Sequence, residues 1–165
     1  MKIDKNILVI ANGHVPDVNR FFKFIEDDPF IVCCDGAAKN ALNLDIIPDV
    51  IIGDIDSLPY DLVKKMSDKI IKISHQNSND LSKALDWIVE AGGKTVQIFG
   101  ADGLREDHSL ANILLLLESE YKIKISMHAL HGRFDLLNES TSSSGIQMRT
   151  FKSYPGQPVS IFCVS

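Results

Sequence analysis

The chain has 165 residues, of which 45% are hydrophobic, and its formal net charge is −5 at pH 7. This length supports one good hydrophobic core and little more. The acidic balance argues against a nucleic-acid-binding surface, and no apolar run approaches the roughly 20 residues of a membrane span. The N-terminus lacks a small-residue cleavage site, and the three cysteines are an odd number. We therefore expect a reduced cytoplasmic protein.

Short apolar runs alternate with helical patterns along the first 130 residues. The predicted strands cover residues 6–11, 30–34, 49–53, 69–74, 95–99 and 122–130. The predicted helices cover residues 17–27, 35–44, 59–67, 79–91 and 107–119. Most of the strands are continuously apolar, which is typical of strands covered on both faces. The alternation predicts an α/β fold with an open, mostly parallel sheet and helices on both of its faces.

Two of these helices have apolar side chains at helical spacing, which predicts the face that each one buries. These residues are Leu81, Ala84, Leu85 and Ile88 in the fourth helix, and Leu110, Ile113, Leu114 and Leu117 in the fifth.

The pattern changes after Leu130. Residues 131–137 are a candidate further strand, and the polar residues 138–145 are typical of a linker or hairpin loop. Residues 146–151 and 158–165 are predicted β-segments on either side of a turn. We expect an α/β domain at residues 1–137, followed at residues 138–165 by the apparently incomplete start of an all-β sandwich domain.

Polar residues follow each of the first five predicted strands, and ligands of parallel α/β sheets bind beyond the carboxyl ends of the strands. In strand order these residues are Asn12 and Gly13, then Asp35, then Asp54, Asp56 and Ser57, then Gln76 and Asp80, then Arg105, Asp107 and His108. Each has an ordinary alternative as a turn residue, a helix N-terminal carboxylate or a surface ion-pair partner. Five acids that converge on one sheet edge nevertheless favour a binding site.

The third strand ends in an Asp-x-Asp sequence, GDIDS, which covers Gly53 to Ser57. Residues two apart on an extended segment point the same way, so the carboxylates of Asp54 and Asp56 are expected to project from one side. A divalent cation would remove their mutual repulsion, whereas the alternative is a solvated turn.

Charges of both signs at one sheet edge suggest a ligand that needs both a metal and a cationic clamp. A nucleotide polyphosphate with Mg²⁺ fits, since acids hold the metal and Arg105 neutralises phosphate oxygens. The GGKT sequence at residues 92–95 looks like the end of a Walker A motif, but it precedes a strand instead of following one. We therefore give it no role.

Three sequence blocks resemble the catalytic domain of thiamin pyrophosphokinases, in order and spacing, over about residues 7–137. The blocks are DGAAKNAL…IIPDVIIGDIDSL, QNSNDLSKAL and GADGLREDHSLANILLL. This chain departs from the family pattern at Asn77, which replaces an Asp, at Asn79, which replaces a Thr, and at Lys39-Asn40, where an Asn is shifted by one position. Asn77 removes one negative charge from the site, which bears on metal occupancy.

The resemblance implies an enzyme that transfers a pyrophosphoryl group from ATP to the hydroxyl of thiamin, giving thiamin diphosphate and AMP. It implies metal ligands at Asp54, Asp56 and Asp80, a nucleotide and phosphate site lined by Gln76, Arg105 and Asp107, and Asn12, Gly13 and Asp35 near the nucleotide. It also implies a homodimer and a C-terminal β-sandwich that carries much of the thiamin pocket. Two alternatives stay open: a non-catalytic nucleotide-binding module, and a sugar-nucleotide transferase that uses the Asp-x-Asp motif to hold its metal.

Overall fold

The computed structural model describes residues 2–15, 18–75, 77–118, 121–137 and 154–162. In chain order the elements are β1 (Ile7–Ile10), α1 (Val18–Glu26), β2 (Phe30–Cys34), α2 (Ala37–Asn43), β3 (Val50–Gly53), α3 (Tyr60–Lys65), β4 (Ile70–Lys72), α4 (Asp80–Glu90), β5 (Thr95–Phe99), α5 (Glu106–Glu118), β6 (Lys124–Ala129) and β7 (Gly132–Asp135). Every helix and strand predicted up to residue 130 is confirmed, with ends that shift by at most two residues. No described helix has the length and apolar character needed to cross a membrane.

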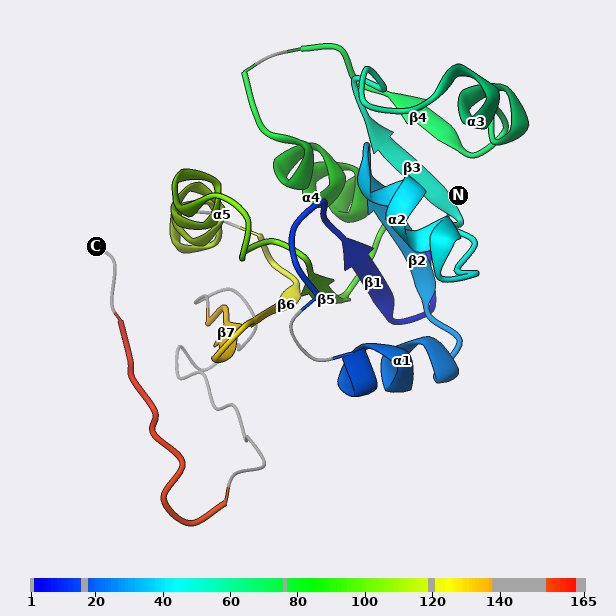
Figure 1. Cartoon of the computed structure of the whole chain (residues 1–165). Helices are drawn as coiled ribbons and strands as arrows, with labels where there is room; N and C mark the ends of the chain where they lie inside the picture. The colour runs from blue at the N-terminus through cyan, green and yellow to red at the C-terminus, as the bar shows by residue number, and fades with distance from the viewer. Residues whose placement is uncertain (1, 16–17, 76, 119–120, 138–153, 163–165) are drawn as a thin grey trace.

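The strands form one sheet in the order β4-β3-β2-β1-β5-β6-β7 (Figure 1). All neighbouring pairs are parallel except β6 and β7, which are antiparallel. Strand β1 pairs with β2 on one side and with β5 on the other, so the order of winding reverses there. In open α/β sheets such a reversal is where a crevice forms at the carboxyl ends of the strands.

Each face of the sheet has its own hydrophobic core, because successive strand residues point to opposite faces. Ile7 and Val9 of β1 pack into the core that α4 and α5 cover. Leu8 and Ile10 of the same strand pack into the core that contains Phe21 of α1 and the alanines of α2. The predicted sheet with helices on both faces is confirmed.

The predicted buried face is correct for α4 and, at three of its four residues, wrong for α5. Leu81, Ala84, Leu85 and Ile88 are all at most 3% exposed. In α5, by contrast, Leu110, Leu114 and Leu117 are exposed, and only Ile113 of the predicted residues packs against the core. The buried residues of this helix are Asn112 and Leu116.

The rotation of α5 is fixed by a polar residue. The Asn112 amide nitrogen donates to the Ala101 carbonyl oxygen at 2.7 Å, and its Oδ1 accepts from Asn79 Nδ2 at 2.9 Å. Because α5 carries leucines on most of its circumference, hydrophobic spacing does not determine which side packs inward.

The region after β6 follows the prediction only in part. The candidate strand at residues 131–137 is confirmed as β7. The described residues 154–162 form a turn in which Gln157 N–H donates to the Tyr154 carbonyl oxygen, but they contain no strand, so the strand predicted from residue 158 is wrong over residues 158–162. A strand needs a hydrogen-bonded neighbour, and the described residues place none beside this segment. The predicted segment 146–151 and residues 163–165 lie outside the described residues, and the division into two domains stays a prediction.

The role of Asn112 can be tested by exchanging polar and apolar residues on the two sides of α5. Asn112→Leu removes both hydrogen bonds and leaves the buried Ala101 carbonyl oxygen without its donor, whereas the exposed Asn79 amide can bind water instead. We therefore expect the free energy of unfolding to fall by about 1–3 kcal/mol. The reverse exchange on the exposed side, Leu114→Asn, should change it by about 0.5 kcal/mol or less. Urea unfolding of both variants measures this, and a larger loss in Leu114→Asn would contradict the observed rotation of the helix.

Candidate active site

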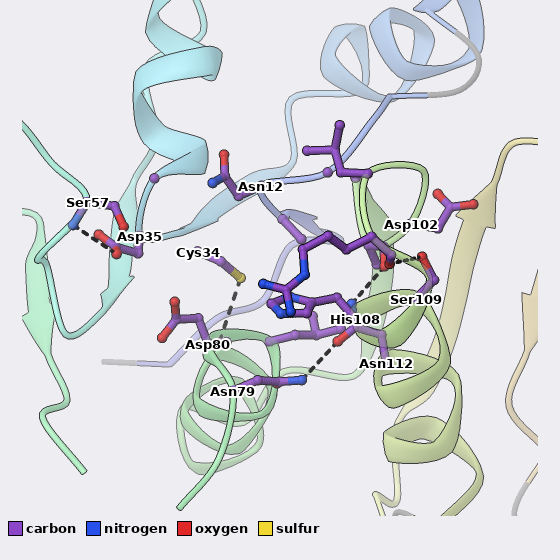
Figure 2. Close-up of a pocket in the computed structure, with 18 of the residues that line it drawn as sticks. Asn12, Cys34, Asp35, Ser57, Asn79, Asp80, Asp102, His108, Ser109 and Asn112 are labelled. Atoms are coloured by element: carbon purple, nitrogen blue, oxygen red, sulfur yellow. Dashed lines mark hydrogen bonds between the residues drawn. The ribbon is translucent and has the colours of Figure 1, made fainter. Parts of the chain in front are cut away.

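A cavity of about 460 Å³ opens at the carboxyl ends of the central strands, a volume within the range of small-molecule sites. Its walls come from the segments that follow β1, β2, β3 and β5 and from the first turns of α4 and α5. Asp35 and Ser57 lie on one side of it, and His108, Ser109 and Asn112 lie on the other (Figure 2). The cavity therefore occupies the sheet edge that the sequence predicts.

Three carboxylates gather at one side of this edge. Asp35, Asp54 and Asp56 each offer an oxygen, and these oxygens lie within 4.8 Å of one another. Asp35 follows β2, whereas Asp54 and Asp56 follow β3, and the two strands are parallel neighbours. The carboxyl ends of such neighbours lie side by side, which brings the acids together.

The route by which Asp54 and Asp56 converge differs from the predicted one. Strand β3 ends at Gly53, and Ile55, between the two acids, has a left-handed backbone conformation with φ of 67°. The segment is therefore a turn, so the expectation of an extended segment is wrong. The structure still brings the two side chains together.

Asp35 has the most enclosed of the three carboxylates. The residue is 4% exposed, and its Oδ2 accepts a hydrogen bond from the Ser57 backbone N–H at 3.4 Å. Its Oδ1 is buried and has no hydrogen-bond partner among the described residues. Burial raises the pKa of Asp35, and the nearby charges of Asp80 and Asp54 raise it further.

The donor set at this cluster fits a hard divalent cation. All three ligand groups are carboxylates, and oxygen ligands are what Mg²⁺ and Ca²⁺ prefer. A cation would also satisfy the Asp35 oxygen that lacks a donor. Gly53 permits the close packing here, since a Cβ atom at this position would lie 2.7 Å from the Asp35 Cβ.

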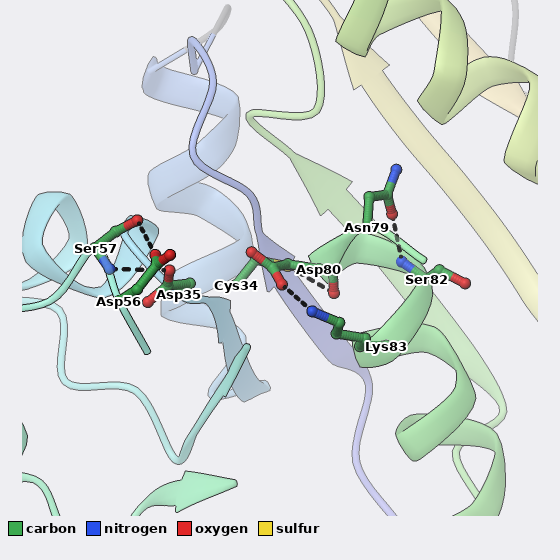
Figure 3. Close-up of polar contacts among 8 residues, drawn as sticks. All are labelled: Cys34, Asp35, Asp56, Ser57, Asn79, Asp80, Ser82 and Lys83. Carbon is green, nitrogen blue, oxygen red and sulfur yellow. Dashed lines mark hydrogen bonds and ion pairs between the residues drawn. The ribbon is translucent and has the colours of Figure 1, made fainter. Parts of the chain in front are cut away.

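Asp80, a predicted metal ligand, lies in a different arrangement. Its Oδ1 is 3.0 Å from the Lys83 Nζ, one turn further along α4, and this ion pair lies apart from Asp35 and Asp56 (Figure 3). The Lys83 side chain is only 3% exposed, so its charge is held in the protein interior next to the cavity. The geometry thus favours Asp35 over Asp80 as the third member of the acidic group.

Arg105 and Asp107 are bound to each other. The Nε and Nη2 atoms of Arg105 donate to the two carboxylate oxygens of Asp107, and both side chains are about 65% exposed. The hydrogen bonds from Arg105 lower the pKa of Asp107 to about 2. Arg105 lines the cavity and Asp107 does not.

Gly13 has a backbone role at the mouth of the cavity. Its N–H donates to the Gly100 carbonyl oxygen at 2.6 Å, and the next N–H, of His14, donates to the Asp102 carbonyl oxygen at 2.9 Å. A Cβ atom on Gly13 would lie 2.3 Å from the Gly100 oxygen. The segments after β1 and β5 can approach this closely only with glycine at position 13.

Most of the predicted site residues line the cavity. Those that do are Asn12, Gly13, Asp35, Asp54, Ser57, Asp80, Arg105 and His108. Asp56 and Asp107 do not line the cavity, but each accepts a hydrogen bond from a residue that does, Ser57 and Arg105 respectively. Gln76 lies outside the described residues. The prediction missed lining residues that include Lys83, Asp102, Ser109 and Asn112. Of these, Asp102 carried a signal, as a further acid in the segment that follows β5.

Comparison with known proteins identifies the family. The model of the family "Thiamin pyrophosphokinase, catalytic domain" matches residues 21–128, more than half of the chain. The chain belongs to this family.

Known members agree with this assignment. The thiamine pyrophosphokinase of Bacillus subtilis (strain 168) is 30% identical over 132 residues, which are 74% of this chain and 60% of that protein. The crystal structure of thiamine pyrophosphokinase from Bacillus subtilis has a TM-score of 0.64 at 28% identity, covering 75% of this chain and 60% of that one. The structure from Geobacillus thermodenitrificans has a TM-score of 0.57 at 29% identity, covering 72% and 58%. The chain thus spans about 60% of the length of these thiamin pyrophosphokinases.

The burial of Asp35 makes a prediction about stability. A raised pKa means that the folded protein holds the Asp35 proton more tightly than the unfolded chain does. Ionisation therefore destabilises the fold progressively as the pH rises above the unfolded-state value, and fully above the folded-state pKa. We expect Asp35→Asn to raise the thermal unfolding midpoint at pH 7 without metal. The gain should shrink as the pH falls and disappear below the ordinary Asp value of 3.8.

The control is Asp45→Asn, at an exposed aspartate that also has a positive φ of 59°. This variant should leave the midpoint unchanged. Added Mg²⁺ should stabilise the unaltered protein more than Asp35→Asn. A less stable Asp35→Asn protein at pH 7 without metal would show that the ionised carboxylate helps to hold the fold together.

Proposed function

We propose that this chain takes part in the transfer of a pyrophosphoryl group from ATP to thiamin, giving thiamin diphosphate and AMP. The observation that carries the proposal is the charge arrangement around one cavity. Three carboxylates, of Asp35, Asp54 and Asp56, meet at one side, while the cations of Arg105 and Lys83 line it elsewhere. This arrangement suits a metal-bound polyphosphate, and family membership supplies the reaction.

We propose Mg²⁺ as the cation at Asp35, Asp54 and Asp56. When bound, it would neutralise charge on the phosphate oxygens of ATP. The carboxylates would fix its position, and the depth of Asp35 would hold it at the carboxyl ends of β2 and β3. Asp80 then acts from the other side of the cavity, through its ion pair with Lys83.

The proposed reaction is a direct transfer without a covalent enzyme intermediate, so the main task of the protein is to stabilise negative charge with cations. The thiamin hydroxyl attacks the β-phosphorus of ATP and loses its proton, a new P–O bond forms, and the bond to the α–β bridging oxygen breaks to release AMP. Negative charge grows on that bridging oxygen and on the oxygens around the β-phosphorus. Arg105, with its planar guanidinium, and Lys83, with its buried ammonium, are the side chains proposed to stabilise this charge.

Three parts of the proposal rest on the family resemblance alone. These are the binding of thiamin, the homodimeric assembly and the C-terminal β-sandwich that carries much of the thiamin pocket. Since this chain spans about 60% of the length of its relatives, activity of the chain itself is the first property to test.

The test is AMP release from ATP and Mg²⁺ with and without thiamin, followed by chromatography. We expect AMP only when thiamin is present, and no Mg²⁺-dependent turnover in Asp54→Asn or Asp56→Asn, both of which should remain folded by circular dichroism. Asp61→Asn, an exposed acid of α3, is the matched control and should keep full activity. Bound ATP without thiamin-dependent AMP would favour a non-catalytic nucleotide-binding module, and normal turnover in Asp54→Asn would remove the metal assignment.

The variant Arg105→Lys distinguishes two roles of Arg105, binding of phosphate oxygens and a surface ion pair. Lysine keeps the charge but loses the two-pronged geometry of the guanidinium. We therefore expect kcat/KM to fall on the order of 10- to 100-fold, the range for hydrogen bonds to charged groups. Arg133→Lys is the control, because Arg133 also donates to an aspartate two residues further on, Asp135, and lies on β7. Equal kcat/KM values for both variants would assign Arg105 only to its pair with Asp107.

A further inference from the structure

One residue beside the acidic cluster has a backbone conformation that its side chain disfavours. Among the described non-glycine residues, those with positive φ are Asp28, Asp35, Asp45 and Ile55. Aspartate tolerates the left-handed region, whereas a β-branched residue there is a true outlier. Ile55, with φ of 67°, is therefore strained in a way that the three aspartates are not.

The side chain of Ile55 is what holds this conformation. It is half-buried and packs against the hydrophobic core on the side of the sheet that α1 and α2 cover. Leu58, three residues later, is buried in the same core. The apolar side chain thus fastens the middle of the Asp54–Asp56 turn to the body of the domain, and the burial offsets the backbone strain.

The turn at Ile55 determines where the acids lie. In an extended segment, the Cα atoms of residues two apart are separated by about 6.6 Å along the strand. The second residue therefore lies that much further along the chain direction than the first. The left-handed residue instead turns the chain between Asp54 and Asp56, and an oxygen from each reaches within 4.8 Å of the other and of Asp35. A second fastening comes from the Ser57 N–H, which donates to Asp35.

We propose that Ile55 is a positioning residue for the metal site: its strained, core-anchored backbone sets the spacing of Asp54 and Asp56 against Asp35. The inference rests on the proposed function in one respect, namely that the acidic cluster binds a divalent cation. It goes further in assigning the spacing of the ligands to an apolar side chain that does not touch the cation.

The experiment measures Mn²⁺ binding and thermal stability separately. Mn²⁺ prefers the same oxygen ligands as Mg²⁺, and titration of the chain while the free Mn²⁺ paramagnetic resonance signal is recorded gives the affinity without any turnover. The variants are Ile55→Asn, which favours the left-handed region but lacks the apolar anchor, and Ile55→Val, which keeps a branched apolar side chain. The matched control is Ile25→Asn, at a half-buried α1 isoleucine that packs against the same core.

We expect Ile55→Asn to weaken Mn²⁺ binding about 10-fold, the lower end for residues that support metal ligands. Ile25→Asn should leave Mn²⁺ affinity unchanged but lower the unfolding midpoint by more than Ile55→Asn does, because only the Ile55 exchange relieves backbone strain. Ile55→Val should bind Mn²⁺ like the unaltered chain. If Ile55→Asn does not fold, Ile55→Gly carries the same comparison, since glycine also adopts positive φ freely.

Two results would overturn the inference, and they are distinguishable. Unchanged Mn²⁺ affinity in Ile55→Asn, or an equal loss in Ile25→Asn, would make Ile55 an ordinary core residue while the metal site stands. A complete lack of Mn²⁺ binding by the unaltered chain would remove the metal site itself, and the role of Ile55 with it.

Discussion

Repulsion among three carboxylates is the constraint on which the rest of this site depends. Asp35, Asp54 and Asp56 would separate in a free chain, because like charges this close disfavour one another. They are held together because β2 and β3 are parallel neighbours whose ends meet at one edge. Those strands in turn keep their register through the apolar cores on both faces of the sheet. Hydrophobic burial across the domain therefore maintains an unfavourable electrostatic arrangement at its edge.

The three acids differ in how far they are removed from water, and this difference organises the cluster. Asp35 is buried, Asp54 is half-buried and Asp56 is exposed. The buried carboxylate has one backbone donor, from Ser57, and one oxygen without a partner among the described residues, so it gains most from a cation. The exposed carboxylate of Asp56 stays hydrated, so its charge destabilises the fold little. A graded cluster of this kind leaves an open side through which a hydrated ion can enter.

The sequence predicts the position of the site better than its internal geometry. Continuous apolar strands require a two-sided parallel sheet, and the polar residues after them must then share an edge. Contacts between distant residues decide the rest: Asn112 turns α5 through bonds to Ala101 and Asn79, against the leucine pattern. Ile55 adopts a conformation that its residue type disfavours, which no propensity would predict. Such conflicts between local preference and observed structure are expected where a site is being shaped.

The two cations at the cavity, Arg105 and Lys83, form ion pairs in different environments. They therefore differ in how easily each can leave its partner. Arg105 pairs with Asp107 where both side chains are about 65% exposed, and an exposed ion pair contributes little to stability and is easily exchanged. Lys83 pairs with Asp80 at 3.0 Å, with 3% of the Lys83 side chain and 33% of the Asp80 side chain exposed. Removing Asp80 would leave the buried Lys83 charge uncompensated. Arg105 can thus leave Asp107 at small cost, whereas separating Lys83 from Asp80 costs more. The cavity thus combines one cation whose ion pair is exposed with one whose ion pair lies within the first turn of α4.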